Sequence, residues 1–105
     1  MEKTLNFTFD GKEYTLAYTR DTVITTEKMG FNYADVSSKP MSTLILLWRG
    51  AFLAHHDTLT IKEVDAIFEK IDKKGLLDAL LDLYKAPVES LFEADEKNLV
   101  RWTVT

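Results

Sequence analysis

His55, His56 and Asp57 form the one cluster of potential metal ligands in the sequence, which contains no cysteine. Adjacent side chains on a helix point about 100° apart, whereas two histidines that share an ion usually stand at positions i and i+4. We therefore expect these histidines to cap the end of a helix, where the last carbonyls need donors and positive charge is favoured. The sequence predicts no metal and no other cofactor.

Catalytic arrangements are equally weak in this sequence. Asp78, Asp82 and Glu89 could serve in acid–base chemistry, but their spacing puts them opposite a leucine stripe, on a solvated helix face. The chain has no Gly-x-Ser-x-Gly elbow, no glycine-rich phosphate loop and no spacing that unites a serine with a histidine. The absence of cysteine excludes disulfides and thiol nucleophiles, and it fits a cytosolic protein. We predict that the protein is not an enzyme.

The composition is that of one folded domain spanning residues 1–105, with 46% hydrophobic and 29% charged residues. The net charge is −4, and the excess lies in residues 51–105, which hold 7 basic and 11 acidic side chains. Without a basic stripe, nucleic acid and anionic membranes are not expected partners. The longest apolar run, Leu44 to Trp48, is too short to cross a bilayer, and the first residues do not resemble a signal peptide.

Two segments of alternating polarity flank Asp10-Gly11 and predict a β-hairpin. A two-residue turn there pairs Phe9 with Lys12, Phe7 with Tyr14 and Leu5 with Leu16, so that the apolar residues share one face. Val100, Trp102 and Val104 alternate with polar residues in the same way, and we predict that they add a third strand to the hairpin. The expected fold is α+β, with a small antiparallel sheet packed against a helical middle.

The residues between the strands follow a helical period, which predicts about four helices. They are expected from Thr19–Asp21 to Gly30, for one turn after Asn32, from Pro40 or Met41 to about His55, from Thr60 to Ile71, and from Leu76 onward, with a kink or restart at Pro87. The helix after Pro40 should form the core, because apolar side chains occupy nearly all its faces. Its Gly50 should permit close packing against another backbone.

An apolar seam in the last helix is the predicted partner surface. Its members follow a heptad spacing, with one further aromatic residue beside them: Leu77, Leu81, Tyr84, Val88, Leu91 and Phe92. Such a stripe can bury itself in its own domain or against a partner helix, whereas Trp48 and Phe52 are expected in the core. The seam and a free strand edge at Phe7 or Val104 also leave a homo-oligomer open.

Several short motifs follow one another along residues 5–71 in an order and spacing that match a known family. The match is looser through the helix of Tyr84. The motifs are Phe7-Thr8-Phe9-Asp10-Gly11-Lys12-Glu13-Tyr14, Thr19-Arg20, Glu27 with Gly30-Phe31, Leu47-Trp48-Arg49-Gly50-Ala51-Phe52 with His55-His56, and Thr60-Ile61-Lys62-Glu63-Val64. In this order and spacing the chain resembles the small tail assembly chaperones encoded by tailed phages and prophages of Gram-positive bacteria. The segment after Glu93 departs from the resemblance.

This resemblance implies a non-enzymatic protein that acts in the host bacterial cytoplasm during phage tail assembly. Its partners would be the tape measure protein, which it would keep soluble, and the tail tube protein, which it would help to recruit. The alternative is a structural virion component, such as a tail terminator or connector subunit. The two roles differ in whether the chain remains in finished particles.

Overall fold

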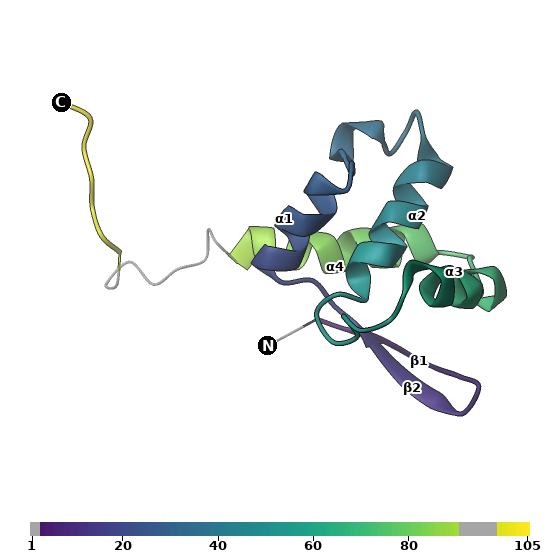
Figure 1. The fold of residues 1–105 in the computed structure, drawn as a ribbon. Coiled ribbons are helices and arrows are strands. Elements are labelled where there is room, and N and C mark those ends of the chain that lie inside the picture. The colour runs from purple at the N-terminus through teal and green to yellow at the C-terminus, as the bar shows by residue number, and fades with distance from the viewer. Residues whose placement is uncertain (1–2, 91–98) are drawn as a thin grey trace.

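A β-hairpin and four α-helices make up the fold in the computed structural model, which describes residues 3–90 and 99–105 (Figure 1). The elements are β1 (Leu5–Phe9), β2 (Lys12–Leu16), α1 (Arg20–Lys28), the 3-10 turn η1 (Tyr33–Asp35), α2 (Pro40–Ala51), α3 (Ile61–Lys70) and α4 (Leu76–Ser90). The predicted α+β class is confirmed. None of the described helices combines the length and the apolar character that a membrane span requires.

The hairpin has the predicted register. β1 and β2 are antiparallel, and the turn residues Asp10 and Gly11 both have positive φ, at 50° and 76°. Two positive φ angles are typical of the two-residue turn that matches the twist of a hairpin. The pairs are Leu5–Leu16, Asn6–Thr15, Phe7–Tyr14, Thr8–Glu13 and Phe9–Lys12. The large apolar side chains therefore share the face that packs on the helices.

The predicted third strand is absent from the sheet, which has two strands in the described residues. Residues 99–105 form no regular secondary structure, and Val100, Trp102 and Val104 are 90%, 79% and 88% exposed. Alternation makes a segment suitable for a strand, but a strand forms only where a neighbouring edge accepts its hydrogen bonds. In this structure the C-terminal segment lies clear of the hairpin (Figure 1).

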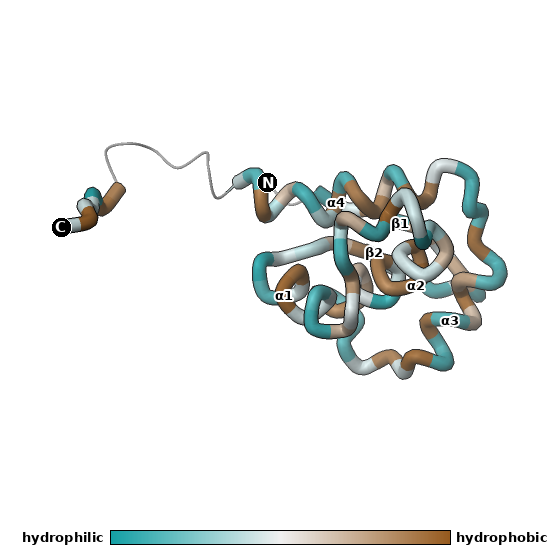
Figure 2. The backbone as a smooth tube through the Cα atoms, turned by 90° about the horizontal axis from the view of Figure 1, so that it is seen from above, coloured by the Kyte–Doolittle hydropathy of each residue, from teal (hydrophilic) through white to brown (hydrophobic). Residues whose placement is uncertain are grey.

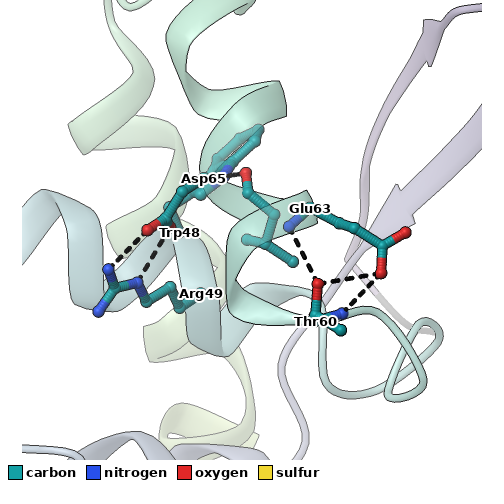
Figure 3. A network of polar contacts seen from close by, with 6 residues as sticks. Trp48, Arg49, Thr60, Glu63 and Asp65 are labelled. Atoms are coloured by element: carbon teal, nitrogen blue, oxygen red, sulfur yellow. Dashed lines mark hydrogen bonds and ion pairs between the residues drawn. The ribbon is translucent and has the colours of Figure 1, made fainter.

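The helix starts follow the sequence signals closely. Thr19 caps α1 by accepting a hydrogen bond from the Thr22 N–H, and Pro40 is the first residue of α2. Thr60 and Glu63 form the predicted capping box at the start of α3 (Figure 3). α4 runs through Pro87 to Ser90 without a restart.

Helix α2 lies in the middle of the domain, with α1, α3 and α4 around it (Figure 2). Trp48 on this helix and Phe52, the residue that follows it, are fully buried, as predicted. Trp48 stacks on Phe7 of the hairpin with ring centroids 5.8 Å apart, and it contacts Phe68 of α3 at 5.7 Å. Its indole Nε1 donates a hydrogen bond of 2.9 Å to the Val64 carbonyl of α3. One side chain thus joins the sheet, α2 and α3.

Gly50 lets α1 and the residues just before it pack tightly against α2. A Cβ at this position would fall on Thr26 Oγ1 and lie 2.5 Å from the Tyr18 hydroxyl oxygen. The tight contact is therefore with two side chains, and the expected contact with a backbone is wrong. Those side chains are held in place, because Thr26 Oγ1 donates to the Thr22 carbonyl and the Tyr18 hydroxyl donates to the Leu47 carbonyl, both at 2.7 Å.

We predict that Gly50→Ala lowers the free energy of unfolding by about 1–3 kcal/mol, because the added methyl group overpacks this contact. Urea unfolding followed by circular dichroism measures the loss. Thr26→Ala makes room beside Gly50, so the double variant should lose less than the sum of the two single variants. Additive losses would show that the contact at Thr26 does not cause the effect.

Candidate functional site

The predicted partner stripe is divided between the core and the surface. Leu81 and Tyr84 are buried, with 8% and 7% of their surface exposed, and Leu77 packs against the core. Val88 is 39% exposed at the end of α4. Leu91 and Phe92 lie outside the described residues. Of the described stripe residues, Val88 is therefore the one that offers an exposed surface to a partner.

Tyr84 holds α4 against α1 and the residues on either side of α1. Its ring lies 4.9 Å from that of Phe31 and 5.4 Å from that of Tyr18, between ring centroids. Its hydroxyl donates a hydrogen bond of 3.4 Å to Glu27 Oε2 of α1. Burial, followed by the nearby Glu27 charge, raises the pKa of Tyr84 to about 12. The hydroxyl therefore stays protonated at neutral pH and acts as a structural donor.

An apolar groove lies where the start of α1 meets the end of α4, two ends that Figure 1 shows side by side. We call it the α1/α4 groove, and it has a volume of about 180 Å³. Its lining residues are Arg20, Val23, Ile24, Pro87 and Val88. Pockets that enclose small molecules usually have about 300–1,000 Å³. This groove is smaller and suits one or two apolar side chains of a protein partner.

The sequence pointed to Val88 but not to the other walls of the groove. Val23 and Ile24 come from α1, and Ile24 is 49% exposed. The available signal was local: in an otherwise polar helix, two consecutive apolar residues cannot both face the core, since neighbours point about 100° apart. Pro87 adds an apolar ring to the α4 wall of the groove.

His56 does not cap the helix that precedes it. α2 ends at Ala51, earlier than predicted, and His56 turns toward the hairpin. Its Nε2 accepts a hydrogen bond of 3.0 Å from the Thr15 N–H, and its ring packs against Tyr14 and Phe52. The predicted role of His56 is therefore wrong, and the residue instead covers the outer edge of β2. No group of three or more potential metal ligands gathers among residues 3–90 and 99–105.

A second hollow, of about 170 Å³, lies between α2, α3 and the loop that joins them. Arg49 at its rim makes a bidentate ion pair with Asp65, from Nε to Oδ1 at 3.0 Å and from Nη2 to Oδ2 at 2.7 Å (Figure 3). Hydrogen bonds from Arg49 lower the pKa of Asp65, and the same bonds raise the pKa of Arg49. The Arg49 guanidinium thus joins α2 to α3. Because Asp65 already neutralises its charge, the hollow is a weak binding site for an anion.

Comparison with known proteins places the whole chain in one family. The family described as Domain of unknown function (DUF5055) matches residues 1–105. The chain belongs to this family. No curated protein and no solved structure matches the chain.

We predict that aspartate destabilises the protein far more at one position of the stripe than at another. Leu81→Asp should unfold the domain, because it adds the burial of a carboxylate to the about 2–5 kcal/mol that loss of a core leucine costs. Val88→Asp should change the free energy of unfolding by no more than about 0.5 kcal/mol, since this side chain is already exposed. Thermal and urea unfolding of both variants measure the difference, and equal losses would contradict the division of the stripe.

We also predict that Asp65 contributes to stability in a pH-dependent manner. Its pKa in the folded state lies below the ordinary 3.8, so the contribution is fully present above that value and is lost as the pH falls through the lowered pKa. At pH 7, Asp65→Asn should cost about 0.2–1 kcal/mol, the usual range for a partly exposed ion pair. Urea unfolding at several pH values should show wild type and variant converging below 3.8.

The matched control is Glu13→Gln, which removes an exposed carboxylate of β2 that makes no ion pair with the described residues. It should follow the wild type at every pH. A constant gap between Asp65→Asn and wild type down to acid pH would mean that the carboxylate charge is not what stabilises the α2–α3 contact.

Proposed function

We propose that this protein is a non-enzymatic phage tail assembly chaperone that binds the tape measure protein through the α1/α4 groove. The observation that carries the proposal is the exposed apolar groove at the one exposed position of the described stripe, Val88. The resemblance in motif order supplies the biological setting, the host bacterial cytoplasm. Membership of DUF5055 is compatible with this role and adds no activity of its own.

The groove fits the mode in which a partner helix lays its apolar face into a hydrophobic channel. Ile24 and Val88 stand on opposite walls, from α1 and α4, so apolar side chains of a client helix can lie between them. Arg20 at the rim forms no ion pair with the described residues and can meet an acidic side chain of the client. We therefore expect the bound segment to be an amphipathic helix with an acidic residue beside its apolar stripe.

The small size of the groove suits reversible binding. Stable protein complexes usually bury about 1,200–2,000 Å² in total, with an apolar centre much larger than the contact between two exposed side chains. A site built around Ile24 and Val88 is therefore weak for each bound segment. A chaperone that covers a long helical client with many copies and then releases it needs weak individual contacts. Recruitment of the tail tube protein would follow from the same complex.

We predict that Ile24→Asp and Val88→Asp each strongly weaken client capture without unfolding the protein. The test is co-expression with the tape measure protein encoded downstream, scored by how much of that protein is soluble and co-purifies. A charge on either wall must be desolvated when an apolar segment binds, so we expect a loss of about tenfold or more.

The matched control is Ile61→Asp, because Ile61 is 60% exposed at the start of α3 and lies outside the α1/α4 groove. This variant should solubilise the client as the wild type does. Capture that survives both groove substitutions would overturn the proposed surface. A client that stays insoluble with folded wild-type protein, or the chain's presence in purified virions, would favour the structural virion component instead.

A further inference from the structure

We propose that the protein self-associates by strand exchange: residues 99–105 of one copy pair with the free edge of β1 in a second copy. This inference is independent of the proposed function, since it concerns the chain alone. It rests on two features of the structure that have no pairing partner within a single copy. One is a strand edge with outward-facing backbone groups, and the other is an exposed segment with a strand pattern.

The acceptor is the outer edge of β1. Residues that flank a two-residue turn exchange hydrogen bonds, so Phe9 and Lys12 form a bonded pair and Thr8 and Glu13 do not. The N–H and C=O groups of Thr8, and by the same alternation those of Asn6, therefore point away from β2. Within the described residues, neither backbone takes a hydrogen-bond partner from another element. This edge is a template for a further strand.

The outer edge of β2 is covered, which makes the choice of edge specific. By the same alternation the Thr15 N–H points outward, and it donates to His56 Nε2 at 3.0 Å. Just beyond β2, the Ala17 N–H donates to the Ala51 carbonyl at 3.1 Å. The end of α2 and the loop after it thus take up backbone donors on the β2 side, whereas the outward groups of Asn6 and Thr8 have no such partner among the described residues.

The donor is the C-terminal segment. Val100, Trp102 and Val104 alternate with Arg101, Thr103 and Thr105, and valine, threonine and tryptophan are residues that favour strands. Paired with β1 in the register that sets Trp102 beside Phe7, the three apolar side chains would continue the face formed by Leu5, Phe7 and Phe9. These β1 side chains are partly buried against the core, so an added strand would cover what remains exposed.

A second copy is the occupant that fits these observations. The chain's own segment lies clear of its own hairpin, with Trp102 79% exposed, so donor and acceptor are available at the same time (Figure 1). A large aromatic and two valines exposed together are costly to leave in water. When each copy donates its segment to another, every edge and every segment gains a partner, as in domain swapping.

The experiment measures the size of the purified full-length protein by sedimentation velocity over a range of concentrations. Wild type should associate. Trp102→Asp, which damages the donor, and Thr8→Pro, which removes an outward N–H without touching the β1–β2 bonds, should each weaken association by about tenfold or more. A mixture of these two variants should form a mixed complex, because each retains the half that the other lacks.

The control is Thr103→Asp, which adds the same charge to the other face of the segment and should associate as the wild type does. Asn6→Pro provides a second acceptor variant if Thr8→Pro does not unfold cooperatively. A wild type that stays monomeric overturns the proposal, and protection of the amides of 99–105 from hydrogen exchange in that monomer would show pairing within one chain. Failure of the two variants to form a mixed complex would also overturn it.

Discussion

The burial of Trp48 is the interaction on which the rest of the structure depends. Its ring stacks on Phe7 of the hairpin and contacts Phe68 of α3, while its indole N–H reaches the Val64 carbonyl. A two-stranded hairpin is marginal alone in water, and a short helix such as α3 is marginal as well. Both become stable because each lays its apolar face against the same side chain of α2. The Arg49–Asp65 ion pair, one residue along from Trp48, adds a directional contact that sets how α3 lies on α2.

On the other side of α2, the packing is set by the absence of a side chain at Gly50. α1 comes close enough for Thr26 and Tyr18 to fill that space, and the Tyr18 hydroxyl satisfies the Leu47 carbonyl. Burial of Tyr18 raises the pKa of its hydroxyl, so the group remains a donor at neutral pH. This approach fixes the position of α1, against which α4 then packs through Tyr84. The α1/α4 groove is a consequence of that arrangement, because one wall comes from α1 and the other from α4. The packing at Gly50 and at Tyr84 holds these two helices side by side.

The fold could largely be predicted from local patterns. The hairpin register followed from alternation around Asp10-Gly11, and the helix starts followed from Thr19, Pro40 and the Thr60–Glu63 capping box. The candidate site could be predicted only in part. A heptad stripe gives the direction of its side chains on one helix, but it does not say whether that face meets the same domain or a partner. Leu81 and Tyr84 lie in the core. Val23, Ile24 and Pro87 line the groove, although the sequence did not predict them as partner-binding residues.

The sequence by itself therefore determined the helices, their order and the hairpin with its register, because these depend on turn chemistry, capping and the period of apolar residues over a few positions. Only the tertiary structure decided which apolar faces are buried and which stay exposed. It placed His56 at the edge of β2 and buried Leu81 and Tyr84 of the predicted stripe. It also left Val88 and the segment of Trp102 exposed. Burial is a property of what lies opposite a side chain, and residues distant in sequence supply that surface.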